Sequence, residues 1–262
     1  MKPPPTPMVN AVSDVMTLKG ATHAHVLLCD DVIERLVKFH DGGKMVVNEY
    51  LGQKICQLLS LPVKDDAFVA VGQELIDASP GLKSQGVRAG LHYGKVYDRL
   101  ASDLQTLNVS DPKQVVNAPC LPGVILLNNL VHNTDTGNPN HLLTPSTAGS
   151  YTYTVIDLGN SAGGNWSPQS LQVTSTVNGI VGTHPLLAGT VTGIESFSPY
   201  LDRVEALTQD DLVAIVESIP SAWNVTVEEK GAWVQFILKR SKLVRQAILN
   251  NTIAFPSWRR PT

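Results

Sequence analysis

Two polar residues in the middle of the chain have the types and spacing of a site that transfers phosphate. Asp135 and Asn140 lie five positions apart within residues 132–142, a stretch rich in Asn, Thr and His. In phosphotransfer enzymes a carboxylate accepts the proton of the acceptor hydroxyl, and an Asn five residues later binds Mg²⁺. The interval predicts Asp135 as the catalytic residue and Asn140 as a metal ligand.

A second metal ligand is predicted a short way downstream. Residues 151–156 alternate like a β-strand and are followed by Asp157-Leu158-Gly159. A strand that ends in Asp-x-Gly can deliver a carboxylate to the phosphates, so Asp157 is predicted to bind Mg²⁺ together with Asn140. Residues 133–140 alone would be typical of a surface turn, since Asn, Asp, Gly and Pro favour turns. The strand and the second motif together favour chemistry.

The elements that would hold a nucleotide are predicted upstream. Residues 26–39 indicate a β-hairpin with a turn at 30–31, and Lys38 lies near its end, where a lysine would reach the phosphates. Residues 44–60 have helical apolar spacing, and Glu49 in the early turns could pair with Lys38. Both residues have a second interpretation. Lys38 could be a solvated strand lysine, and Glu49 could simply be favoured by the helix dipole.

The small-residue loop at 19–25 precedes this hairpin and would close over the phosphates. Gly20 and Thr22 are therefore predicted to contact the nucleotide, and Thr22 is the first candidate for self-phosphorylation. The Pro-rich residues 1–13 are expected to be a poorly ordered or extended lead-in. The polar, Gly-rich stretch 72–94 is the expected hinge between two lobes.

Two other local patterns are interpreted as structural. His23 and His25 share one strand face but have no third metal ligand nearby, so we interpret them as structural or solvent-facing. Gly42-Gly43-Lys44 does not fit the Walker pattern, because Lys38 stands where the first glycine is required.

The second half of the chain is predicted to be mainly helical. Residues 121–131 form an apolar, buried helix that would present the catalytic loop, and residues 160–182 have the composition of a mobile loop covering a site. Amphipathic helices are expected at 194–207, 209–218 and 227–250. Lys239, Arg240 and Lys242 on the last helix are interpreted as a solvated face.

Composition excludes several classes of protein. The 262 residues, 43% hydrophobic and 16% charged, suit one globular catalytic unit, and a net charge of −3 gives no support to a nucleic-acid or membrane partner. Cys29, Cys56 and Cys120 lie far apart without a Cys-x-x-Cys, so neither a disulfide framework nor a zinc site is expected. We expect no signal peptide, because residues 1–7 lack an apolar core, and no membrane span, because no run approaches about 18 apolar residues. We expect a soluble, cytoplasmic protein.

Taken in order, these motifs resemble the HipA-like kinase family, in the shorter form that lacks the HipA N-terminal segment. Val47–Leu51, Leu61–Val63 and Thr192–Phe197 add to the resemblance, which covers roughly residues 18–250. It implies an α+β, two-lobed protein-kinase-like fold of the HipA/PI3-kinase-like type. A lead-in at 1–17, a small β-rich nucleotide-binding lobe at 18–75 and a mainly helical catalytic lobe at 76–262 would follow from it.

The resemblance also implies a function. It makes the chain an ATP- and Mg²⁺-dependent kinase that phosphorylates a hydroxyl, usually of Ser or Thr on a protein, with Lys38 as the phosphate-binding lysine, Asp135 catalytic, and Asn140 and Asp157 on the metal. Thr136, after the catalytic Asp, and Thr22, in the entry loop, depart from residues common in relatives. The acceptor stays open among a protein, a small alcohol and the chain itself.

The sequence offers two alternative functions, a hydrolase and a pseudokinase. Gly159-Asn-Ser161-Ala-Gly163 matches the nucleophile elbow of hydrolases, but residues 164–168 are poor helix formers and His184, the only later histidine, precedes every later acid. A catalytically inactive nucleotide-binding or partner-binding pseudokinase, with Thr136 as its support, stays open as an alternative.

Overall fold

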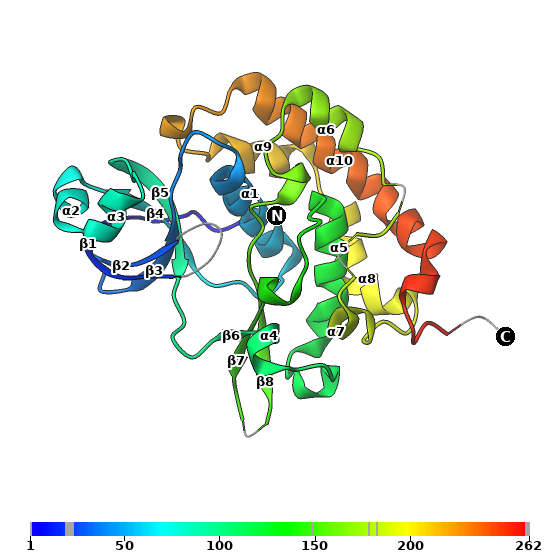
Figure 1. Cartoon of the computed structure of the whole chain (residues 1–262). Helices are drawn as coiled ribbons and strands as arrows, with labels where there is room; N and C mark the ends of the chain where they lie inside the picture. Colours follow the sequence, from blue (N-terminus) through cyan, green and yellow to red (C-terminus); the bar gives the residue numbers. More distant parts are fainter. Residues whose placement is uncertain (1, 19–23, 148, 178, 182, 260–262) are drawn as a thin grey trace.

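A small closed β-barrel and a larger, mainly helical part make up the computed structural model, which describes residues 2–18, 24–147, 149–177, 179–181 and 183–259 (Figure 1). The barrel order is β1-β2-β3-β5-β4. Its strands are β1 (Met8–Thr17), β2 (His25–Cys29), β3 (Glu34–Lys38), β4 (Asp66–Val71) and β5 (Gly90–Val96). Buried apolar side chains such as Leu27, Val37 and Val69 fill its interior. The predicted hairpin is confirmed, since β2 pairs antiparallel with β3 and Lys38 ends β3.

The N-terminal prediction is corrected by β1. Residues 8–17, expected to belong to an extended lead-in, form a strand that pairs antiparallel with β2 and parallel with β4. The register with β2 shifts between Ala11 and Ser13 and again between Asp14 and Met16. Such irregularities break the alternation of apolar and polar residues, which is the sequence signal for a strand.

The predicted hinge at 72–94 is also wrong. This stretch forms α2 (Gln73–Ala78), α3 (Pro80–Ser84) and β5, which pairs with both β3 and β4. A Cβ on Gly94 would lie only 2.9 Å from a methyl of Val69, so this position in β5 needs glycine. Because glycine is uncommon in strands, it weakened the strand pattern in the sequence. The barrel therefore continues past residue 75. Where the two lobes divide as folding units stays a prediction.

Helix α1 (Met45–Leu59) lies between the barrel and the helical part, as Figure 1 shows. The helix predicted at 44–60 is confirmed, and it ends at Ser60, which adopts a left-handed conformation. Every residue from Val46 to Leu59 except Gln57 is buried. Because both parts of the molecule pack against it, α1 is fixed on almost all sides.

The helical part surrounds α5 (Leu121–Val131), all of whose residues are buried. The predictions for α5 and for α10 (Val227–Asn250) are confirmed to the residue. The other helices of this part are α4 (Leu104–Leu107), α6 (Pro168–Thr174), α7 (Pro185–Ala188), α8 (Ser198–Glu205) and α9 (Gln209–Glu217). A second sheet, β6 (Ser102–Asp103), β7 (His141–Pro145) and β8 (Tyr151–Val155), lies at its edge.

Helix α6 corrects the prediction of a continuous loop at 160–182. Ser167 caps the helix by accepting from the Ser170 backbone N–H, the Ser170 hydroxyl bonds back to Ser167, and Pro168 occupies the first turn. Ser followed by Pro is a helix-start signal that the Gly- and Ser-rich composition obscured.

Arg240 corrects the prediction that the basic residues of α10 face solvent. Lys239 and Lys242 are exposed, but Arg240 is only 1% exposed, and burial lowers the pKa of its guanidinium to about 10. The guanidinium donates to main-chain carbonyls at the C-terminal ends of α5 and α6, those of Asn129, Leu130, Thr174 and Thr176, at 2.6 to 3.0 Å. A cation is favourable there, because helix C-termini carry unpaired carbonyls and partial negative charge. Arg240 thus joins three helices.

We predict that Arg240→Met lowers the free energy of unfolding by about 3–5 kcal/mol, because it leaves several buried carbonyls without a donor. Lys239→Met, on the exposed neighbour, should change it by no more than about 0.5 kcal/mol. Urea unfolding followed by circular dichroism measures both variants. Equal effects of the two substitutions would show that the Arg240 contacts contribute nothing to stability.

Candidate active site

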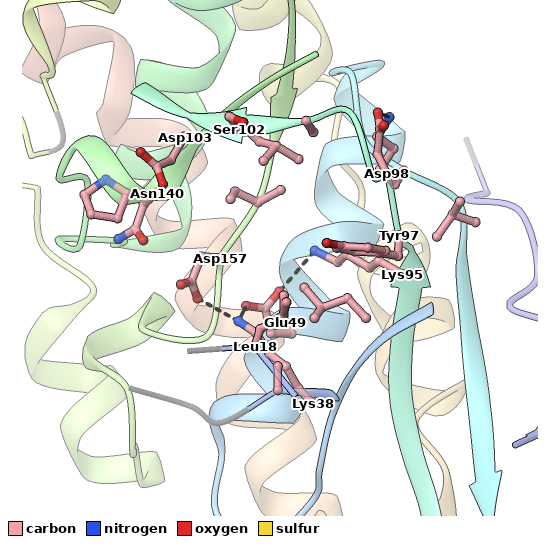
Figure 2. A pocket seen from close by; sticks show the side chains of 18 of the residues that line it. Leu18, Lys38, Glu49, Lys95, Tyr97, Asp98, Ser102, Asp103, Asn140 and Asp157 are labelled. Atoms are coloured by element: carbon pink, nitrogen blue, oxygen red, sulfur yellow. Dashed lines mark hydrogen bonds and ion pairs between the residues drawn. The ribbon is translucent and has the colours of Figure 1, made fainter. Parts of the chain in front are cut away.

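A cavity of about 630 Å³ opens between the barrel, α1 and the helical part (Figure 2). The structure brings the predicted residues together along its wall, although they come from distant parts of the chain: Lys38, Glu49, Asp135, Asn140 and Asp157. Gly20 and Thr22 lie outside the described residues.

Glu49 is the centre of a buried charge cluster. Its carboxylate pairs with Lys38 through one oxygen and with Lys95 through the other, at 3.0 Å from the Lys95 Nζ. Lys38 also lies 2.7 Å from Asp157 Oδ1. Figure 2 shows these side chains converging from β3, β5, α1 and the segment after β8. The expected pairing of Lys38 with Glu49 is present, whereas Lys95 was not foreseen.

The surrounding charges decide how these groups ionise. Burial alone would lower the pKa of Lys38, but Glu49 and Asp157 raise it above its ordinary value. Burial alone would raise the pKa of Glu49, but Lys38 and Lys95 hold it well below its usual range. The lysine and the glutamate are therefore both charged across the neutral range.

Asp157 behaves differently from Glu49. Burial raises the pKa of its carboxyl above the usual value, although Lys38 acts in the opposite direction. A divalent cation beside Asp157 would favour the charged form, and its carboxylate with the Asn140 amide oxygen offers the hard oxygen ligands that Mg²⁺ prefers. The residues present therefore fit a magnesium ion, which Asp157 and Asn140 would hold.

The backbone around Asp157 is held by α1. Asp157 adopts a left-handed conformation with φ of 54°, and the Gly159 N–H donates to Glu49 Oε1 at 3.0 Å. The buried Asn48 amide shares its two N–H groups among the carbonyls of Gly159, Ser161 and Gly164, at 2.7 to 2.9 Å. Asn48 and Glu49, neighbours on α1, therefore fix the segment that carries Asp157.

The loop predicted to be catalytic begins where α5 ends, at His132 in a left-handed conformation. Asp135 is exposed at the cavity, and the Asn140 side chain donates to the Asp135 main-chain carbonyl at 2.9 Å. This bond uses the amide nitrogen of Asn140, which leaves the amide oxygen for a metal. The residues at both ends of the five-residue interval are thereby held in one turn.

Two histidines that sequence reasoning left without a role support this loop. His141 donates from Nε2 to the Thr136 carbonyl at 3.2 Å and accepts at Nδ1 from the Tyr153 hydroxyl at 2.8 Å. Burial lowers the pKa of His141 to about 4, so the neutral ring that makes both bonds persists at neutral pH. His184 bonds Asn138 at 2.5 Å. The sequence signal available for His141 was its position directly after Asn140.

The rival nucleophile, Ser161, has no catalytic partner. Its side chain is 4% exposed, and its Oγ has no hydrogen-bond partner in the part of the chain that the structure describes. Ser161 begins a short 3-10 turn that ends at Gly163, rather than the helix that a nucleophile elbow requires. His25 donates from Nδ1 to Asp14 Oδ1 at 2.9 Å, in keeping with a structural histidine. His23 lies outside the described residues.

The connection between the two parts of the molecule also lines the cavity. Tyr97, Asp98 and Asp103 lie on the segment that follows β5, and this segment connects the barrel to the helical part. Asp98 is held there by the Lys64 ammonium at 2.7 Å and the Thr144 hydroxyl at 2.8 Å.

Across the described ranges, no helix is long and apolar enough to cross a membrane.

Comparison with known proteins finds similarity in structure but not in sequence. No family model and no curated protein matches the sequence. The structure is similar to that of the Helicobacter pylori proinflammatory kinase CtkA, with a TM-score of 0.63 and 12% identity over 97% of this chain and 100% of that chain. The Golgi casein kinase with Mn and ADP bound gives a TM-score of 0.52 and 11% identity over 97% and 75%.

A Shewanella oneidensis HipA, solved with HipB and operator DNA, has a TM-score of 0.42 and 15% identity over 81% of this chain and 60% of that one. At these identities the likeness to the first two structures concerns the fold. The fold implied by the resemblance to HipA-like kinases is thereby confirmed in its coarse form: the chain has a kinase-like fold, with a β-rich N-terminal part and a helical C-terminal part.

Proposed function

We propose that the chain is an ATP- and Mg²⁺-dependent phosphotransferase of the HipA-like kinase type, which moves a γ-phosphate to a hydroxyl. The observation that carries the proposal is the meeting of Lys38, Glu49, Asp135, Asn140 and Asp157 on one cavity. These are the groups that phosphotransfer requires, and they come from four separate segments: β3, α1, the loop that holds Asp135 and Asn140, and the segment after β8. The Golgi casein kinase structure, which holds Mn and ADP, supports a nucleotide with a divalent cation.

Each residue has a role that its contacts support. Lys38, oriented by Glu49, would neutralise charge on the phosphates, while Asn140 and Asp157 would hold Mg²⁺. When bound, this ion neutralises the β- and γ-phosphates and orients them for transfer. Asp135 would orient the acceptor hydroxyl and accept its proton as the new bond to phosphorus forms.

The acceptor is proposed to be a protein Ser or Thr, or a hydroxyl of the chain itself. Asp135 is exposed, so a protein segment can reach it without entering the cavity. Thr136 was the support for an inactive pseudokinase, but the contact that holds it is made by its main-chain carbonyl, which any residue would supply. The absence of a nucleic-acid partner and a cytoplasmic location remain predictions.

Lys38→Met should lower the turnover number about 10²–10³-fold, because the lost charge acts on the transferring phosphate. The fold should persist, since Glu49 keeps Lys95 as a charged partner. Lys44→Met is the matched control, because Lys44 pairs with Glu229 and does not line the cavity. Transfer of labelled γ-phosphate, first in the purified protein and then with a lysate of its own cell, measures both. Wild-type turnover in Lys38→Met would remove Lys38 from the site.

The two aspartates should respond differently to substitution. Asp157→Ala should weaken Mg-ATP binding and abolish transfer, because Asp157 is assigned to the metal. Asp135→Asn should keep the affinity for Mg-ATP but lower the rate by about 10²–10⁴-fold, the usual contribution of one positioned acid or base.

Calorimetry with Mg-ATP beside the transfer assay tests this difference. A wild-type chain that binds Mg-ATP but transfers to no acceptor, water included, would favour the pseudokinase. If neither substitution affected binding or transfer, residues 133–140 would be a surface turn.

A further inference from the structure

The side chain of Asp135 is held by a residue outside the catalytic loop. Asn160 donates from Nδ2 to Asp135 Oδ2 at 2.7 Å. The other bonds of Asp135 involve its main chain: its N–H donates to Asn133 at 3.3 Å, and its carbonyl accepts from Asn140. Within the described residues, Asn160 is therefore the hydrogen-bond partner of this carboxylate.

Asn160 is itself fixed in place. It precedes the 3-10 turn at Ser161–Gly163, but its side chain makes no capping bond there. The carbonyls on either side of it, those of Gly159 and Ser161, both accept from the buried Asn48 side chain, at 2.8 and 2.9 Å. The backbone of Asn160 is thus tied to α1, while its amide group points away from its own segment to Asp135.

We propose that Asn160 is the positioning residue for Asp135, an inference that rests on the proposed phosphotransfer. Its amide fixes one carboxylate oxygen, which leaves the other oxygen to accept the proton of the acceptor hydroxyl. The hydroxyl oxygen then bonds the γ-phosphorus, the bond from that phosphorus to the bridging oxygen breaks, and ADP leaves. Asn160 touches neither acceptor nor phosphate in this role and acts through Asp135.

The segment that carries Asn160 would both supply the metal ligand Asp157 and hold the carboxylate of Asp135. Asp157, the proposed metal ligand, lies three residues before it on the stretch that Asn48 and Glu49 hold. A displacement of this stretch would move the metal ligand and release the carboxylate of Asp135 together. Misplacement of a reacting group by about 1 Å can cost on the order of 10²-fold in rate.

A double-mutant cycle with Asp135 tests the inference. Asn160→Ala should lower kcat about 10-fold to 100-fold, part of the 10²–10⁴ that a positioned base supplies, while the KM for ATP stays within about twofold. In an Asp135→Asn background, Asn160→Ala should cost nothing further, because the group through which it acts is already lost. Asn165→Ala is the control, since Asn165 lies on the same stretch but bonds the Lys44 N–H, and it should retain wild-type kcat.

The outcomes separate the two hypotheses. Suppose that the wild type transfers phosphate. The positioning role is wrong, and the proposed function stands, if Asn160→Ala keeps the wild-type kcat or mainly raises KM. The same holds if Asn160→Ala lowers kcat by a further factor in the Asp135→Asn background. If the wild type transfers phosphate to no acceptor, the proposed function fails and the inference fails with it. A kcat loss confined to Asn160→Ala and absent from the Asp135→Asn background supports both.

Discussion

The site depends on one buried carboxylate. Glu49, with a side chain only 2% exposed, accepts from Lys38, Lys95 and the Gly159 N–H. An isolated charge in such a place would be very costly, whereas one with several hydrogen-bonded partners is tolerated. Because the donors come from β3, β5 and the segment after β8, satisfying Glu49 brings three parts of the chain to α1. The geometry of the cavity follows from this requirement.

Helix α1 can carry this role because it cannot easily move. Its buried residues include Val47 and Leu51, which pack in the larger hydrophobic core, so rotating the helix outward would expose them. Glu49 on this helix pairs with Lys38 and accepts from the Gly159 N–H, and Asn48 adds a second attachment by donating to the Gly159 carbonyl. Two neighbouring side chains of α1 therefore hold the segment that carries Asp157.

The sequence predicted the parts of the site that depend on local spacing. Asp135, Asn140 and Asp157 were identified because a fixed interval and a strand ending in Asp-x-Gly are visible in the chain itself. Helix α5 was predicted from a continuous apolar run with prolines at its start, and α10 from its amphipathic pattern. The roles of these residues stay predictions, whereas the structure shows that all three line one cavity.

Residues defined by distant partners could not be predicted in this way. Lys95 lies in β5, which was not predicted as a strand because Gly94 weakens the strand pattern, and it contributes to the site by pairing with Glu49. Arg240 resembles its solvated neighbours in sequence, and it is buried because the carbonyl ends of α5 and α6 converge on it. Strand β1 was missed because its register shifts disturb the alternation. In each case tertiary contacts outweighed the local pattern.

The charges of the cavity give a physical reason for a divalent cation. In the described chain its wall holds three lysines and five carboxylates, a formal charge of −2, contributed by Lys38, Lys64, Lys95, Glu49, Asp98, Asp103, Asp135 and Asp157. Lys38 and Lys95 are already paired with Glu49, and Lys64 is paired with Asp98. A nucleotide triphosphate, itself strongly negative, would be repelled by such a wall. A cation held by Asp157 and Asn140 would offset that repulsion where the proposed transfer brings the γ-phosphate to Asp135.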